Sequence, residues 1–182
     1  MAVHPQTTYM VAALVCASIG AAYDLRSRRI PNLLTGPALV FGLLLHVSLG
    51  GFSQLGLSML GGLIAGSIFF LFFMAGGMGA GDVKLMIAVG CLAGTVYLKE
   101  ILILTVLAGA AMGITLALFR GRLRQTVLNV VTLVQHHVSE GLTEHPEFNL
   151  NQPSALRVPY AIPIAVGCLL TFLLASGKEW IQ

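Results

Sequence analysis

Six long apolar stretches constrain the fold of this 182-residue chain more than any other feature of its sequence. Most are about 17 to 20 residues long, the length of helix that crosses the hydrocarbon core of a bilayer. Backbone polar groups in lipid must bond within their own segment, which helices achieve. We therefore predict an all-α polytopic membrane protein, a six-transmembrane-helix bundle in a single domain over residues 1–182, with helices at about 7–23, 33–50, 57–75, 83–98, 100–119 and 158–176.

The composition excludes an ordinary soluble domain. Hydrophobic residues make up 57% of the chain and charged residues 9%, whereas soluble domains are about 25% charged. The first apolar stretch has no Lys or Arg before it and three Arg after it, the reverse of a secretory signal, so we predict a retained membrane helix. The cysteines lie inside apolar stretches without a CxxC pair, so we expect buried thiols rather than disulfides or a zinc site at Cys16, Cys91 and Cys168.

The ten basic side chains are divided unequally between the two sides of the predicted bundle. Only Lys99 and Lys178 fall on one side, and eight fall on the other. Cytoplasmic loops are enriched in Lys and Arg, so we predict a protein of the inner (cytoplasmic) membrane with both termini outside the cytoplasm. The basic charge thus indicates contact with membrane lipids and not with nucleic acid. The eight are Arg26, Arg28, Arg29, Lys84, Arg120, Arg122, Arg124 and Arg157.

The cytoplasmic connection at about 120–157 contains apolar residues at helical spacing. This pattern predicts an amphipathic helix that lies on the inner membrane surface. Its alternative is a helix packed over the cytoplasmic mouth of the bundle. The apolar positions are Leu123, Val127, Val130, Val131, Val134 and Val138.

Three GxxxG patterns lie within the predicted spans. Small residues at this spacing let helix backbones approach closely. We expect these glycines to pack the bundle internally rather than to form a dimer, and the oligomeric state is left open. The pairs are Gly62 and Gly66, Gly90 and Gly94, and Gly109 and Gly113.

The chain contains only two aspartates, Asp24 and Asp82, and each lies at the cytoplasmic end of a predicted span. Acidic groups near hydrocarbon are costly and are usually functional. Although 58 positions separate the two residues, helix packing is able to bring them together. Each aspartate is also explained as a group at a helix end that pairs with nearby basic residues, namely Arg26, Arg28 and Arg29 for the first and Lys84 for the second.

A facing pair of carboxyl groups has well-defined chemistry. Two close carboxylates do not both ionise cheaply, so they share one proton. The ionised member then takes a proton from water, which attacks a peptide carbonyl, and the protonated member polarises that carbonyl. No metal or other cofactor is needed. The sequence does not assign the acid and base roles within the pair.

Asp82 follows a glycine-rich segment, Gly79-Ala-Gly81-Asp82. Glycines admit unusual backbone angles and let another backbone approach closely, so this segment is a candidate active-site loop. A flexible linker is the alternative, whereas a phosphate site is disfavoured because no GxxxxGK[ST] motif is present. Lys84 either orients Asp82 and lowers its pKa or anchors the helix at the lipid headgroups.

Two segments resemble the catalytic motifs of type IV prepilin peptidases. The segment from Asp24 to Ile30-Pro31-Asn32 resembles the first motif, an Asp followed by Ile-Pro-Asn, and the segment 79–84 resembles the second, GxGDxK. Residues 159–163, Pro-Tyr-Ala-Ile-Pro, resemble the entry to the last helix of the family.

This resemblance implies a membrane aspartyl endopeptidase with Asp24 and Asp82 as catalytic residues. Gly79, Gly81 and Lys84 then form the active-site loop, and Ile30, Pro31 and Asn32 support the first motif. We expect Asn32 to cap the helix that follows it. The implied substrates are prepilin or pseudopilin precursors, cleaved after a Gly between a basic leader and an apolar helix, and pilus-assembly machinery is a further implied partner.

The connection between the first two predicted helices departs from the longer members of this family. Those members resemble this chain with an added region that carries paired CxxC motifs, and they also N-methylate the new amino terminus. Here residues 24–32 form a nine-residue connection without cysteine. We therefore expect peptidase activity without N-methyltransferase activity, similar to the peptidases of tight-adherence (Flp) pili or to archaeal preflagellin peptidases.

Two other functions remain open from the sequence. A proton-coupled transporter also uses intramembrane acids, although its usual inverted repeat is not evident here and its acids lie nearer the bilayer midplane. An inactive pilus-assembly subunit is the other alternative, and the presence of both aspartates disfavours it.

Overall fold

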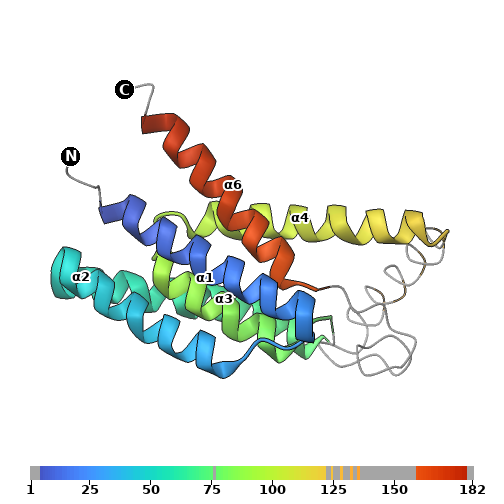
Figure 1. Cartoon of the computed structure of the whole chain (residues 1–182), viewed down its shortest axis with the longest axis horizontal. Coiled ribbons are helices and arrows are strands. Elements are labelled where there is room, and N and C mark those ends of the chain that lie inside the picture. The colour runs from blue at the N-terminus through green and yellow to red at the C-terminus, as the bar shows by residue number, and fades with distance from the viewer. Residues whose placement is uncertain are drawn as a thin grey trace.

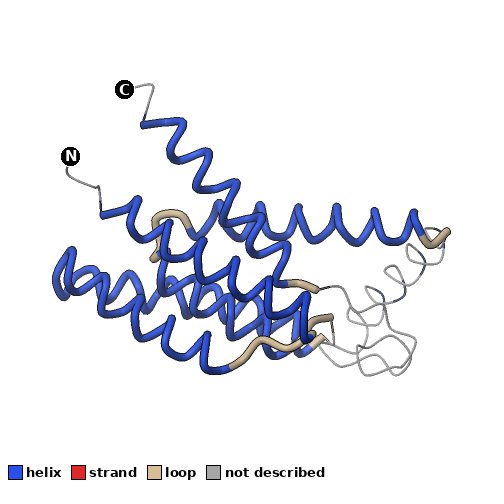
Figure 2. The backbone as a smooth tube through the Cα atoms, in the orientation of Figure 1, coloured by secondary structure: helices blue, strands red, loops and turns tan. Residues whose placement is uncertain are grey.

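The computed structural model describes residues 5–75, 77–121, 124, 128, 132, 135 and 159–179. Its helices in these ranges are α1 (Pro5–Ser27), α2 (Asn32–Met74), α3 (Ala80–Ala93), α4 (Leu98–Phe119) and α6 (Ala161–Glu179). Figures 1 and 2 show that the described part consists of these helices and their connections. The predicted all-α fold is therefore confirmed.

Three of the described helices, α1, α2 and α4, are long and apolar enough to cross a membrane. The apolar part of α6, Ala161–Ser176, is shorter. The chain is thus a polytopic membrane protein, as its apolar stretches predicted. Figure 1 shows the end of α1 and the beginnings of α3 and α6 together at one end of the bundle, whereas α1 begins and α6 ends at the opposite end.

Helix α2 contains a sharp reversal at Gly51, which has φ 73° and ψ −172°. Glycine adopts this conformation readily, whereas other residues resist it. Figure 1 shows the ribbon of α2 folding back on itself, so we call residues 32–50 its first arm and residues 52–74 its second arm. A straight helix of 43 residues would be about 65 Å long, roughly twice the hydrocarbon thickness. The two arms correspond to the predicted spans 33–50 and 57–75.

The boundary between the fourth and fifth predicted spans was wrong. The predicted helix 83–98 is α3, which begins at Ala80 and ends at Ala93. Gly94 ends it with φ 65°, and its N–H bonds to the carbonyl of Gly90 at 2.9 Å. The prediction missed this because the apolar run continues through the turn to α4, which starts at Leu98 instead of at 100.

The last predicted span, 158–176, also starts too early. Pro159 and Tyr160 precede α6, which begins at Ala161. The predicted amphipathic helix in 120–157 falls largely outside the described residues. Four positions of that stretch are described as helical and exposed, and the Thr132 hydroxyl donates to the Leu128 carbonyl at 3.0 Å; they are Arg124, Leu128, Thr132 and Gln135.

Helix α3 is the central helix of the bundle. It packs against both arms of α2, against α1 and against α6. Its residues from Leu85 to Ala93 are buried except for Ile87, which is partly buried. Asp82 lies in the first turn of α3. Its position therefore depends on the packing of α3 against these neighbouring helices.

Close packing of α3 against the second arm depends on glycines. A Cβ atom on Gly61 would lie 2.5 Å from the Gly90 carbonyl oxygen, and one on Gly90 would lie 2.6 Å from the Gly61 oxygen. The predicted GxxxG contacts are internal for Gly62 and Gly66, which lie against Cys91 and Ile87 of α3. Gly94 and Gly109 also pack internally, against His46 and Tyr160 respectively, but a Cβ on Gly113 would meet nothing within 4 Å.

Candidate active site

Asp24 lies in the last turn of α1 and is 8% exposed. The backbone N–H of Ala161, the first residue of α6, donates a hydrogen bond to its carboxylate. Unpaired N–H groups at the start of a helix favour an anion. Burial raises the pKa of Asp24 above its usual value, and the hydrogen bond from the start of α6 opposes part of that rise.

The end of α1 brings a cation to the same carboxylate. Arg28 adopts a positive φ of 53°, and its N–H bonds to the Asp24 carbonyl at 2.9 Å. This left-handed conformation ends the helix and is unfavourable for a residue other than Gly or Asn. The turn places the Arg28 guanidinium where its charge acts on Asp24.

Asp82 is the third residue of α3, and Gly79 is the N-cap of that helix. The Gly79 N–H donates to Asp82 Oδ2 at 3.3 Å, and the Asp82 N–H donates to the Gly79 carbonyl at 3.1 Å. The first of these bonds is one half of a capping box, because glycine has no side chain to supply the other half. The carboxyl group is consequently held at the start of α3, beside the glycine-rich loop.

The structure brings the two aspartates into electrostatic contact. Burial and then the negative charge of Asp24 raise the pKa of Asp82 to about 7, against a smaller lowering by the Gly79 N–H. Two carboxyl groups of this kind hold one proton between them near neutral pH. The predicted convergence of residues 58 positions apart is therefore present in the fold.

Tyr160 is a site residue that the sequence analysis did not single out. Its ring lies against Gly109 of α4, where a Cβ atom would be 3.1 Å from the Tyr160 hydroxyl oxygen. Its hydroxyl also interacts electrostatically with Asp82. The available signal was a polar aromatic residue within the segment 159–163, directly before the residues that form α6.

The two sequence motifs are in direct contact. Lys84 Nζ donates to Asn32 Oδ1 at 2.9 Å, and a Cβ atom on Gly81 would lie 3.4 Å from Ile30 Cβ. The expectation that Asn32 caps a helix was wrong, since Pro31 is the N-cap of α2 and Asn32 is its first residue. Instead, Asn32 and Lys84 tie the start of α2 to the start of α3.

The three cysteines are buried and free, as predicted. Among the residues that the structure describes, no three His, Cys, Asp or Glu side chains gather in a group able to hold a metal ion. The convergent polar groups at this end of the bundle are those of Asp24, Asp82 and Tyr160, with Lys84 and Asn32 beside them.

Comparison with known families identifies the family of the chain. The model of the type IV leader peptidase family matches residues 10–116, which include both aspartates and both motifs. The chain belongs to this family. The resemblance predicted from Asp24, Asp82 and their surrounding residues is therefore confirmed.

Curated relatives in this family are longer than the chain. A prepilin leader peptidase/N-methyltransferase of Aeromonas hydrophila is 41% identical over 104 residues, covering 53% of this chain and 36% of the relative. One of Burkholderia pseudomallei (strain 1026b) is 34% identical over 130 residues, covering 66% of this chain and 41% of the relative. The chain thus spans about two fifths of the curated relatives it matches. No solved structure matches it.

The raised pKa of Asp82 predicts a pH-dependent stability difference between the wild type and Asp82→Asn. Because the folded pKa, about 7, exceeds the unfolded value of about 4, ionisation of Asp82 destabilises the folded state as pH rises between these values. The melting temperature of Asp82→Asn in detergent should exceed that of wild type at pH 8. The difference should shrink toward pH 5.

Asp24→Asn provides the matched control. Removal of the Asp24 charge lowers the pKa of Asp82, so the pH at which Asp82 affects stability should also fall. A melting-temperature difference between Asp82→Asn and wild type that is the same from pH 5 to pH 8 would contradict the raised pKa.

Proposed function

We propose that this chain is an aspartyl endopeptidase that removes the leader peptides of type IV prepilin-like precursors. The observation that carries the proposal is the electrostatic coupling of Asp24 and Asp82 in a member of the type IV leader peptidase family. Hydrolysis of a peptide bond by such a pair requires only water and one shared proton. The scissile bond then lies between the two carboxyl groups.

In the proposed reaction the two aspartates have different starting states. We assign Asp24 as the ionised member, because the Ala161 N–H and the Arg28 charge oppose the rise in its pKa that burial causes. Asp82 holds the proton, because burial and the charge of Asp24 disfavour its ionised form. The Asp24 carboxylate takes a proton from water, whose oxygen attacks the peptide carbonyl while Asp82 donates a hydrogen bond to the carbonyl oxygen.

Collapse of the tetrahedral intermediate completes the reaction. The bond between the carbonyl carbon and the nitrogen breaks, and the leaving amine takes the proton that Asp24 accepted. Tyr160 lies near Asp82, where its hydroxyl is available to orient that carboxyl group or the substrate carbonyl. A Cβ atom on Gly79 would lie 3.3 Å from Asp82 Oδ2, so glycine at this position leaves that oxygen open to a substrate backbone.

The proposed topology has six spans in the inner membrane, with both termini outside the cytoplasm. The pair Asp24 and Asp82, which we call the dyad, then lies at the cytoplasmic face. It is supported by the basic residues of the connection that follows Asp24. The two arms of α2 supply two of the six spans. In this topology the leader of a membrane-inserted prepilin lies at the cytoplasmic surface, where it contacts the dyad.

We also propose that the substrates are of the Flp type and that the chain does not N-methylate its products. The nine-residue connection 24–32 has no cysteine, so the CxxC region that the longer family members carry at that place is missing. Pilus-assembly machinery is the expected partner downstream of cleavage. A transporter function is less consistent with the site, because Asp24 and Asp82 lie at one end of their helices.

Cleavage of a co-expressed Flp-type prepilin in membranes tests the function. Asp24→Asn and Asp82→Asn keep the shape of each side chain and remove its titratable group. Each variant should accumulate to the wild-type level and lose cleavage by roughly 100-fold or more, as expected for loss of an acid–base group. Normal cleavage by both variants would exclude the dyad, and mass spectrometry of the mature product tests for N-methylation.

The contact between Lys84 and Asn32 predicts a smaller effect on cleavage. Lys84→Ala and Asn32→Ala should each lower kcat about fivefold, because a hydrogen bond that positions α3 contributes about 1 kcal/mol. The double variant should be no slower than either single variant, since the two residues share one interaction. Arg29→Ala, a basic residue of the same connection, is the control and should cleave normally. Additive losses in the double variant would refute the shared contact.

A further inference from the structure

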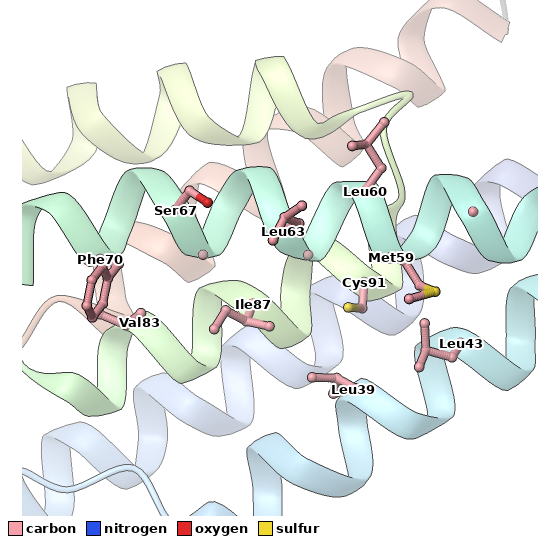
Figure 3. A pocket seen from close by; sticks show the side chains of 13 residues that line it. Leu39, Leu43, Met59, Leu60, Leu63, Ser67, Phe70, Val83, Ile87 and Cys91 are labelled. Carbon is pink, nitrogen blue, oxygen red and sulfur yellow. The ribbon is translucent and has the colours of Figure 1, made fainter.

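The two arms of α2 and helix α3 enclose an apolar groove of about 700 Å³. Figure 3 shows its two walls, formed by the arms, and its floor, formed by α3. The floor residues Val83, Ile87 and Cys91 follow one another at the spacing of one helical turn. None of the residues that line the groove carries a charge, so it suits an apolar occupant.

One end of the groove lies at the start of α3, the helix that carries Asp82. Val83, the next residue, lines the groove. Phe70 of the second arm lies beside Val83 at the same end, as Figure 3 shows. This end of the groove therefore lies one residue along α3 from Asp82.

The outer part of the groove contains space that the protein does not fill. A Cβ atom on Gly56 would meet nothing within 4 Å, whereas Cys91 and Ile87 fill the space beside Gly62 and Gly66. The walls also expose large apolar side chains, with Met59 57% and Leu63 66% exposed. An unfilled glycine beside exposed apolar walls is a surface on which another helix packs closely.

We infer that this groove binds the apolar helix of the substrate, on the side of the scissile bond that remains in the membrane. This inference rests on the proposed function, because the occupant is the substrate segment that is covalently attached to the cleaved bond. A polypeptide in lipid is helical, and the wall from Gly56 to Phe70 is about 21 Å long at the helical rise. This length accommodates about four turns of a substrate helix.

A second apolar groove provides an internal comparison. It has a volume of about 410 Å³ and lies between α1 and the first arm of α2, where Val15 and Phe41 line it. None of its lining residues is adjacent in sequence to Asp24 or Asp82. We assign the substrate helix to the first groove because only that groove, of the two, includes a sequence neighbour of an aspartate.

The substitution Gly56→Leu tests the inference by filling the groove without a clash inside the protein. Leucine is also the better helix former, so the fold is retained. Gly113→Leu is the matched control, because a Cβ at Gly113 likewise meets nothing within 4 Å but the residue lies on α4, away from the groove. With a purified Flp-type prepilin in vesicles, Gly56→Leu should raise KM about tenfold at unchanged kcat, the result of lost binding, and Gly113→Leu should leave both constants unchanged.

Site-specific photo-crosslinking identifies the occupant directly. A photoreactive residue at Leu63 in the inactive Asp24→Asn protein should crosslink to the apolar segment of the prepilin, whereas the same residue at Val15 should not. Crosslinks from Leu63 to lipid alone, or to a second copy of this chain, would overturn the assignment. Equal prepilin crosslinks from Leu63 and Val15 would also overturn it.

The wild-type cleavage rate separates failure of this inference from failure of the proposed function. If wild type cleaves the prepilin and Gly56→Leu matches Gly113→Leu in KM, the groove assignment is wrong and the peptidase function stands. If wild type does not cleave the prepilin, the proposed function fails and the assignment of the groove fails with it.

Discussion

Two carboxyl groups in a partly dehydrated site share a single proton because the second negative charge has little solvent to stabilise it. In this protein those groups are Asp24 and Asp82, and the surrounding helices distribute their charge unequally. Burial raises the pKa of both groups, but the Ala161 N–H and Arg28 act against that rise at Asp24, whereas the charge of Asp24 adds to it at Asp82. The unequal surroundings make Asp82 the acid and Asp24 the base in the proposed reaction.

The rest of the bundle determines where these two groups meet. Helix α3 is short, but it is surrounded by the two arms of α2, α1 and α6, so its first turn has little freedom. Backbone contact between Gly61 and Gly90 draws the second arm against α3. The hydrogen bond between Lys84 and Asn32 then fixes the start of α3 to the start of α2. The contacts that pack α3 in the bundle thus also determine the position of Asp82 in the active site.

Much of the fold was predictable because apolar length directly reports membrane helices. The two arms of α2 were predicted as separate spans, and the uncharged turn between them contains Gly51, which reverses the chain. The end of α3 was not predictable from hydrophobicity, because the residues after Gly94 remain apolar while the backbone leaves the helix. The helix ends because Gly94 has a positive φ, and the hydrophobicity of a segment does not report backbone dihedral angles.

The candidate site was partly predictable for a different reason. The two aspartates stand out because acidic residues are rare in this chain, and the family resemblance indicated their roles. Tyr160 and the pairing of Lys84 with Asn32 were missed, because contacts across 52 positions depend on how helices pack. The groove between the two arms of α2 and α3 was also missed, because it depends on how these helices pack and has no counterpart in local sequence.

The most direct test of the coupled pair is a carboxyl titration by NMR. Because the chain contains only two aspartates, selective ¹³C labelling of aspartate gives two side-chain resonances that Asp24→Asn and Asp82→Asn assign. The account predicts that the Asp82 carboxyl titrates near pH 7 in wild type and at distinctly lower pH in Asp24→Asn. Independent titration of both carboxyl groups near pH 4, unchanged by the substitution of either partner, would contradict it.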